Sequence, residues 1–93
     1  MIKVVAISVL KKGKKREFEE VAQDLIKKTQ AEDGCLSYDL YEDINDENVV
    51  AMLEEWRDQE SIDAHFQTEH LRSAAAKFNE LRDSSQIRFF RKL

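Results

Sequence analysis

The spacing of apolar residues changes along the chain, and each change marks a structural element. Residues 2–10 (IKVVAISVL) are rich in β-branched side chains, which is typical of a strand. Residues 15–31 carry apolar side chains three and four positions apart, which predicts a helix with one apolar face. Gly34 follows as a stop signal for that helix.

The middle of the chain predicts a hairpin. Residues 35–43 and 49–57 each have the composition of a strand, and the stretch 44–48 between them has the polar residues of a turn. A connection this short joins antiparallel neighbours, since parallel strands need a long crossover. We therefore expect these two strands to pair directly.

The last third of the chain predicts two helical segments and a strand. Asp58 is a candidate N-cap for a short helix through Phe66, and Thr68 is a candidate N-cap for a second helix. The apolar face of that second helix comprises Leu71, Ala74, Ala75, Phe78 and Leu81. Residues 86–93 predict a final strand. The order β-α-β-β-α-β, with the second helix split, predicts a single α+β domain over 1–93, ferredoxin-like with a four-stranded antiparallel sheet.

Composition narrows the class of protein. A chain of 93 residues has room for one domain, and its single cysteine, Cys35, excludes an internal disulfide and a multi-cysteine metal site. A net charge of −4 argues against a dedicated nucleic-acid-binding protein. No apolar run approaches the roughly 18 residues of a membrane span, and no signal-peptide cleavage pattern follows the first strand. We expect a cytoplasmic protein without nucleic-acid or membrane partners.

The first and last strands are apolar on both sides. Val4 and Ala6 share one face of the first strand, Val5 and Ile7 share the other, and Phe90 repeats the pattern in the last strand. Two helices cover only one face of a four-stranded sheet, and an antiparallel sheet with one wet face alternates apolar and polar residues. We therefore predict a homodimer in which two sheets pack face to face around a two-fold axis.

Candidate chemistry gathers in the third predicted strand and the helices that follow it. Glu54 and Trp56 share one strand face, so an acid lies beside an indole. His65 falls on the apolar face of the short helix, and His70 opens the next helix. The sequence thus predicts an acid, an indole and two imidazoles between the sheet and the helices.

Ordinary structural roles are the alternative for the same residues. A histidine among apolar side chains is commonly a satisfied core residue, and so is a tryptophan on a strand. Two histidines five positions apart do not share a helical face, so no metal site is predicted unless the break between the helices brings them together. The basic turn 11–16 is interpreted as solvated, with phosphate binding as the alternative if it lies near the pocket.

Three segments in order resemble one known family. Residues 32–41 (EDGCLSYDLY), 54–56 (EEW) and 61–70 (SIDAHFQTEH) closely resemble the antibiotic biosynthesis monooxygenase (ABM) domain, a family of the dimeric α+β barrel superfamily. The resemblance covers nearly the whole chain and implies a homodimer with one pocket per subunit. The family includes quinol monooxygenases, monooxygenases acting on aromatic polyketides, haem-degrading enzymes and an isomerase of a phosphorylated signalling molecule.

The family's recurrent site residues map onto this chain position by position. Its acid and indole fall on Glu54 and Trp56, and its two histidines fall on His65 and His70. The family usually has proline just before the second histidine, where this chain has Glu69. The haem-degrading branch places an asparagine on the first strand, and the first strand here has none, so haem degradation is disfavoured.

Quinol-type members of the family work without flavin, haem or metal. The resemblance therefore implies a cofactor-free monooxygenase that uses dioxygen on a quinol or polycyclic phenol, with a histidine base that deprotonates the substrate. The predicted catalytic residues are His65 as the base, with His70 and Glu54 as polar partners. The predicted substrate-binding residues are Trp56, Phe66 and Met52.

Two other classes of function fit the same residues. One is an isomerase or other acid–base enzyme that acts without oxygen on a small, possibly phosphorylated carbonyl compound. The other is a dimer that binds a small molecule without turnover. Neither fold nor family decides between these classes, because function depends on the site.

Overall fold

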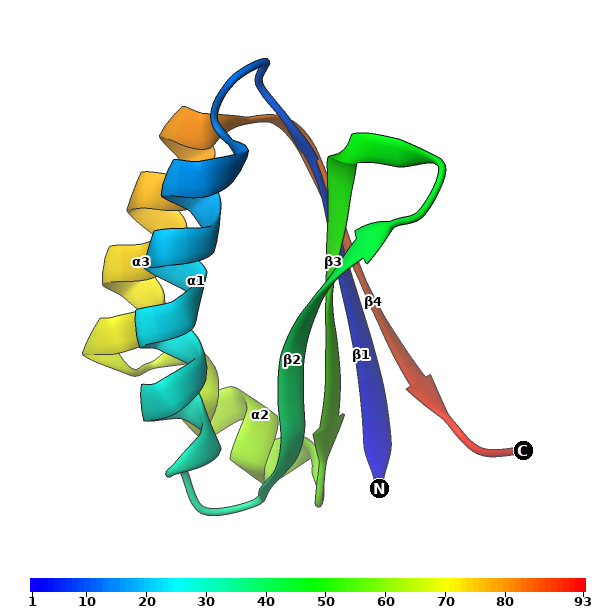
Figure 1. Cartoon of the computed structure of the whole chain (residues 1–93). Helices are drawn as coiled ribbons and strands as arrows, with labels where there is room; N and C mark the ends of the chain where they lie inside the picture. Colours follow the sequence, from blue (N-terminus) through cyan, green and yellow to red (C-terminus); the bar gives the residue numbers. More distant parts are fainter.

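The computed structural model describes all 93 residues as a four-stranded sheet with helices on one face (Figure 1). The elements are β1 (Ile2–Leu10), α1 (Lys15–Gln30), β2 (Cys35–Asp43), β3 (Asp46–Trp56), α2 (Gln59–Phe66), α3 (Glu69–Leu81) and β4 (Arg82–Arg91). The strands lie in the order β2-β3-β1-β4, and all neighbours are antiparallel. The predicted ferredoxin-like order with a split second helix is confirmed.

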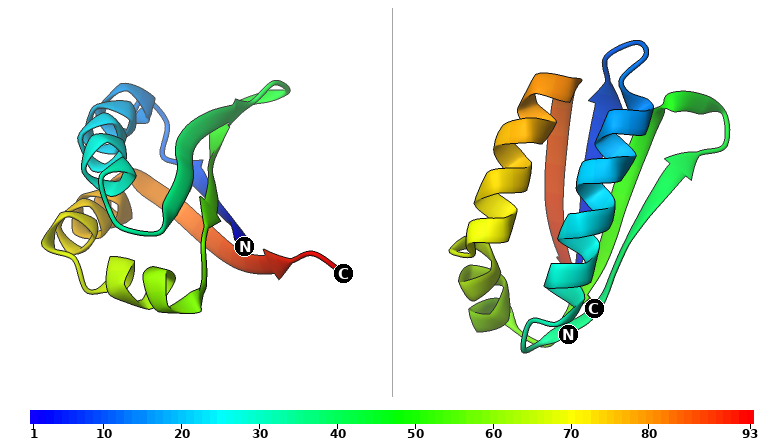
Figure 2. Two further views of the ribbon diagram at one scale, coloured as in Figure 1. Left: turned by 90° about the horizontal axis from the view of Figure 1, so that it is seen from below. Right: turned by 60° about the vertical axis from the view of Figure 1, so that its left-hand side comes forward.

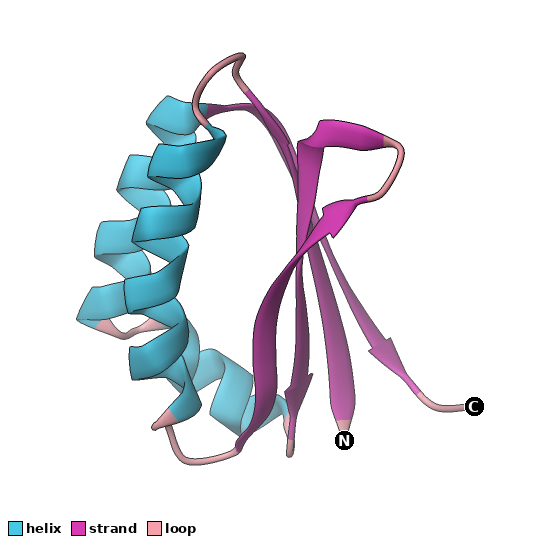
Figure 3. Ribbon diagram, viewed as in Figure 1, coloured by secondary structure: helices cyan, strands magenta, loops and turns pink.

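The molecule has two layers. Helices α1 and α3 lie side by side over one face of the sheet, and α2 lies at the end where β3 finishes (Figures 2 and 3). We call the face under the helices the inner face and the uncovered face the outer face. None of the three helices is both long and apolar enough to cross a bilayer.

Polar side chains cap the starts of α2 and α3, as predicted. The Asp58 side chain accepts a hydrogen bond from the backbone N–H of Ser61 at 2.8 Å, and Thr68 accepts one from Leu71 at 3.3 Å. These caps satisfy backbone donors that a helix start leaves unpaired. The chain therefore breaks at Gln67 and restarts in a new direction, which brings the end of α2 close to the start of α3.

The largest differences from the predicted boundaries are at the starts of two strands. Strand β3 begins at Asp46 rather than at residue 49, because Asp43 accepts a hydrogen bond from the N–H of Asn45 and closes the hairpin early. Strand β4 begins at Arg82 rather than at residue 86, since α3 passes into the strand without a loop. The second difference matters for the site, because it carries Arg82 into the sheet.

The core fills the space between the inner face and the helices. Phe18 of α1 stacks on Phe78 of α3 with ring centroids 4.2 Å apart, above the inner-face residues of β1 and β3. Burial of these large apolar side chains provides the main stabilisation of the fold. The outer face has no such cover, although it carries Val5, Ile7, Val9, Leu53 and Phe90.

Candidate active site

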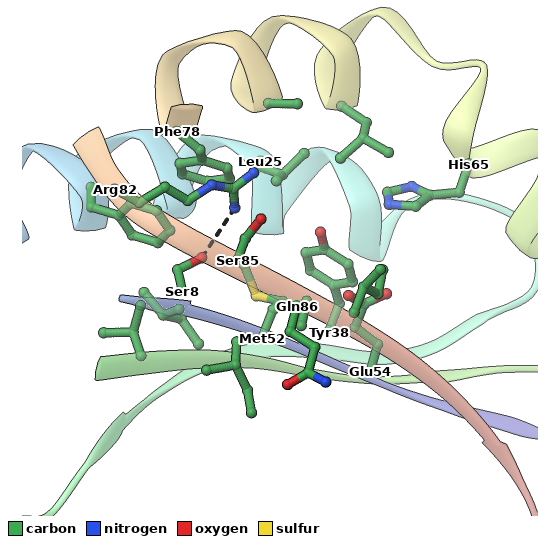
Figure 4. Close-up of a pocket in the computed structure, with 18 of the residues that line it drawn as sticks. Ser8, Leu25, Tyr38, Met52, Glu54, His65, Phe78, Arg82, Ser85 and Gln86 are labelled. Carbon is green, nitrogen blue, oxygen red and sulfur yellow. Dashed lines mark hydrogen bonds between the residues drawn. The ribbon is translucent and has the colours of Figure 1, made fainter. Parts of the chain in front are cut away.

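A cavity of about 240 Å³ lies between the inner face of the sheet and the helices (Figure 4). Hydrophobic residues make up 13 of the 19 that line it, so polar groups inside it stand out. Arg82 lies toward one end of the cavity, and His65 and Glu54 lie toward the other (Figure 4). An apolar cavity with a few convergent polar groups is the usual form of a small-molecule site.

One ring nitrogen of His65, Nε2, has no hydrogen-bond partner in the protein. Its Nδ1 lies 2.7 Å from Oε2 of Glu32, and no protein group pairs with Nε2. The residue is 2% exposed, and its ring packs against the indole of Trp56, with centroids 4.7 Å apart. Burial lowers the pKa of His65, and hydrogen bonding to Glu32 opposes this effect. The result is a neutral, fixed imidazole suited to accept a proton.

Glu32 holds both histidines through one oxygen atom. Its Oε2 lies 2.7 Å from Nδ1 of His65 and 2.7 Å from Nε2 of His70. Glu32 comes from the loop between α1 and β2, while the two histidines come from α2 and α3. The break between these helices at Gln67 and Thr68 is what allows one carboxylate to reach both rings.

The same three side chains form a donor set that a divalent metal accepts. Their spacing argues for hydrogen bonds instead. Two ligands of one tetrahedral zinc ion, each about 2.0–2.1 Å from it, lie about 3.3 Å apart. Both nitrogen–oxygen distances here are 2.7 Å, which is the length of a charge-assisted hydrogen bond.

His70 does not line the cavity. It lies on the other side of the helix layer, where α1 and α3 form a polar groove with it. We call this the outer groove, and it is lined mainly by Glu20, Asp24, Lys28, His70, Ser73 and Lys77. The Glu32 carboxylate therefore joins a cavity histidine to a histidine on the helix surface.

Glu54 and Trp56 form a second polar pair beside His65. The indole Nε1–H of Trp56 donates to Oε1 of Glu54 at 2.9 Å, while Glu54 lines the cavity and is 7% exposed. Burial raises the pKa of Glu54 to about 7, in spite of the hydrogen bond from Trp56. Glu54 is thus a group that exchanges a proton near neutral pH at the same end of the cavity as His65.

Replacing Glu54 with glutamine is expected to stabilise the protein above neutral pH. The folded-state pKa of about 7 lies above the ordinary value of 4.5, so between these pH values only the folded protein holds the proton. The free energy of unfolding therefore falls as the pH rises through this window, by at most about 3 kcal/mol. Glutamine keeps an acceptor for Trp56 and removes this fall.

Urea denaturation at about pH 5 and about pH 8 measures this effect. His65 contributes in the opposite sense, because its folded-state pKa is lowered, but it is common to both proteins. Glu55→Gln is the matched control, since Glu55 lies on the outer face and its loss leaves the cavity unchanged. Equal pH dependence in wild type and Glu54→Gln would contradict the buried, protonated Glu54.

Arg82 is a cavity residue that the sequence did not predict. Its guanidinium donates to Oγ of Ser8 at 3.0 Å and to Oδ1 of Asn79 at 2.7 Å, and it lies 6.0 Å from the Phe78 ring centroid. Burial lowers its pKa from the ordinary value, yet it stays charged at neutral pH. It places a fixed positive charge at the end of the cavity opposite His65.

The structure separates the predicted site residues into three groups. Met52, Glu54, His65 and Phe66 line the cavity. His70 reaches the cavity only through Glu32, and Trp56 is fully buried behind the cavity wall. Glu54 was expected to be a polar partner of the histidines; its carboxylate accepts a hydrogen bond from the Trp56 indole, and the carboxylate that contacts both histidines is that of Glu32.

The fold excludes one reading of the basic turn. None of residues 11–16 lines the cavity, and Lys15 forms a 2.7 Å ion pair with Glu42 of β2. A phosphate held by this turn would lie outside the candidate site. The solvated interpretation of the turn is therefore the one the structure favours.

The fold and the site define a ferredoxin-like α+β protein with a small-molecule cavity between its layers. The sequence model of the family described as "Antibiotic biosynthesis monooxygenase" matches residues 1–77. The chain therefore belongs to the ABM family, as its sequence segments indicated.

Proteins of similar sequence and of similar structure support this assignment to the family. A Bacillus subtilis protein described as "Putative monooxygenase YcnE" is 38% identical over 81 residues, which cover 87% of this chain and 85% of that protein. The crystal structure of a conserved protein from Methanosarcina mazei Go1 is similar with a TM-score of 0.96 and 33% identity, covering 99% and 92% of the chains. That of an antibiotic biosynthesis monooxygenase has a TM-score of 0.94 and 28% identity, covering 100% and 99%.

Proposed function

We propose that this protein is a cofactor-free monooxygenase that uses dioxygen to oxidise a small quinol or related phenol. The observation that carries the proposal is the unpartnered Nε2 of His65 in a mostly apolar cavity. Such an imidazole is a base for a phenolic hydroxyl. Membership of the ABM family, and the similarity to YcnE, which is described as a monooxygenase, support the monooxygenase part of this proposal.

In the proposed reaction the substrate itself supplies the electrons that reduce dioxygen. His65 removes the hydroxyl proton, and the resulting anion gives electrons to dioxygen. One oxygen atom enters the ring and the other leaves as water, so a quinol plus dioxygen yields a hydroxyquinone plus water. The protein deprotonates the substrate, holds the anion and keeps bulk water from the intermediates.

The cavity favours a compact substrate. Its volume of about 240 Å³ lies below the roughly 300–1,000 Å³ typical of drug-sized ligands. One or two fused rings fit this space better than a polycycle of four rings. Phe66 and Met52 offer apolar contacts to a ring, and Arg82 offers a cation for an anionic oxygen at the far end.

Dioxygen uptake by chelator-treated protein tests the proposal. The panel comprises a benzoquinol, a naphthoquinol and a four-ring phenol, each corrected for spontaneous oxidation without protein. We expect uptake with the first two to exceed the correction and to yield one equivalent of hydroxylated quinone. Uptake at the spontaneous rate across the panel would contradict the proposal.

Glu54 supports one alternative, an acid–base enzyme that works without oxygen. A carboxyl with a pKa of about 7 near an imidazole can give a proton at one carbon while the imidazole removes it from another. Anaerobic incubation with small α-hydroxycarbonyl compounds separates this class from an oxygenase. Substrate isomerisation under nitrogen would favour it, while binding without turnover in either gas would favour a binding protein.

We also propose a homodimer formed by the outer faces of two sheets. Leu53 is 39% exposed and Phe90 is 50% exposed on a face that no helix covers. Contiguous exposed apolar residues of this kind commonly mark an interface. A two-fold axis would place the same patch of each subunit against the other.

Leu53→Lys is expected to shift the protein from dimer to monomer. Leu53 lies between Val5 and Asp39 in the middle of the outer face, so a two-fold interface would bury the two new charges near each other. Sedimentation at micromolar concentration measures the change. Ala64→Lys adds the same charge on exposed α2 and should leave the dimer intact. A wild-type protein that sediments only as monomer would contradict the dimer.

A further inference from the structure

One carboxylate oxygen joins two imidazoles that face different surroundings. His65 lines the cavity, while His70 lines the outer groove and has a side chain 21% exposed. Both rings lie 2.7 Å from Oε2 of Glu32, and their centroids are 6.3 Å apart. The cavity and the helix surface are therefore linked by three side chains in direct contact.

The short contacts determine where the protons lie. A carboxylate only accepts hydrogen bonds, so each ring must turn an N–H toward Glu32. His65 therefore carries its proton on Nδ1, which leaves Nε2 as the lone pair for a cavity molecule. His70 donates from Nε2, which leaves Nδ1 toward the outer groove.

A single carboxylate compensates the charge of one imidazolium, not of two. When either ring is protonated, its charge pairs with Glu32 and opposes protonation of the other ring at 6.3 Å. Groups that interact this closely titrate as a unit. Once one ring is protonated, a second proton on the cluster is therefore disfavoured.

We propose that His65, Glu32 and His70 hold one exchangeable proton between them, so that proton uptake by His65 from the cavity releases a proton from His70 into the outer groove. Before the step, His70 is the imidazolium and His65 is neutral. Afterwards, His65 is the imidazolium, His70 is neutral and one proton has passed to water. The cluster has zero net charge in both states: the substrate's proton stays on His65, and a different proton passes from His70 to water in the outer groove.

In this arrangement Glu32 and His70 are positioning residues and His65 is the catalytic base. The proton-sharing proposal rests on the proposed function only for the identity of the molecule that gives its proton to His65. The charge sharing itself is a property of the resting protein. The other charged groups around the cluster are Glu54 on the cavity side and Glu20, Asp24, Lys28 and Lys77 on the outer-groove side.

NMR titration of His65 tests the proposal without any substrate. The imidazole nitrogen shifts report both the pKa and the tautomer of each ring. We expect His70→Gln to raise the pKa of His65 by about one unit, because the amide N–H still binds Glu32 but the competing cation is gone. Lys77→Gln removes a cation of the outer groove that does not touch Glu32, and it should leave the pKa of His65 within about 0.3 units.

Glu32→Gln identifies the carrier of the effect. We expect the pKa of His65 to fall, and His70→Gln to have no further effect in this background. If Glu32→Gln does not fold, Glu32→Asp is measured in its place, since the shorter side chain cannot contact both rings. An unchanged pKa of His65 in His70→Gln, or an Nε2–H tautomer in the wild type, would overturn the proposal. Failure of dioxygen uptake would leave these titrations unaffected.

Discussion

His65→Ala is expected to lower the rate of quinol-dependent dioxygen uptake by about 10²–10⁴-fold, the usual loss when a general base is removed. The reason is that the substrate must become an anion before it can reduce dioxygen, and Nε2 of His65 is an unpartnered base in an apolar cavity. Binding should change less than turnover, because the apolar walls remain. The effect should appear in kcat more than in KM.

Controls separate the loss of a base from a change in cavity shape. Leu40→Met alters the same cavity at nearly constant volume, so its rate should stay within about threefold of the wild type. Added imidazole should partly restore the His65→Ala rate, because the truncation leaves space beside Glu32 for a free ring. Rescue should follow the neutral form of the added imidazole as the pH is varied.

A small effect would move the base elsewhere in the same cavity. A loss below about threefold in His65→Ala would contradict the assignment of His65. Glu54 would then be the next candidate, since its pKa of about 7 allows it to take a proton near neutral pH. Glu54→Gln measured in the same assay would distinguish the two.

Most of the fold could be predicted because the local sequence patterns favour the same elements that the tertiary structure contains. Asp58 and Thr68 cap the helices that their positions predicted, and β1, α1 and β2 lie within a residue of their predicted bounds. The beginning of β4 was wrong by four residues, because no turn residue separates Leu81 from the strand. A pattern cannot mark a boundary where the chain changes structure without a loop.

The site could be predicted only in part, since its key contacts join distant segments. The alternation of side chains along a strand placed Glu54 on the inner face, and helical spacing placed His65 on the apolar face of α2. Glu32 lies 33 residues before His65, in a loop without periodicity, so only the folded structure shows that it binds both histidines. Arg82 was missed for the same reason as the start of β4.

Gly34→Ala is expected to lower the free energy of unfolding by about 2–4 kcal/mol. Gly34 has a φ of +86°, which costs an alanine about 1–2 kcal/mol. In addition, a Cβ at this position would collide with the side chain of Ser61, and such overpacking typically costs about 1–3 kcal/mol. Urea denaturation followed by circular dichroism measures the change.

Gly13→Ala is the matched control. Gly13 has a similar φ of +77°, but nothing lies within 4 Å of the position its Cβ would take. Its substitution should therefore cost only the backbone term of about 1–2 kcal/mol. Equal losses in the two variants would contradict a steric role for the close approach of Gly34 to Ser61.

Gly34→Ala should also change the pKa of His65, the candidate base. Gly34 lies in the loop that carries Glu32, and its carbonyl accepts the N–H of Arg57 at 2.8 Å. Ser61 belongs to the first turn of α2, the helix that carries His65. Separating this loop from α2 lengthens the Glu32–His65 contact, so Gly34→Ala should lower the pKa of His65, whereas Gly13→Ala should leave it unchanged. The absence of a side chain at Gly34 therefore helps to hold the carboxylate against the imidazole.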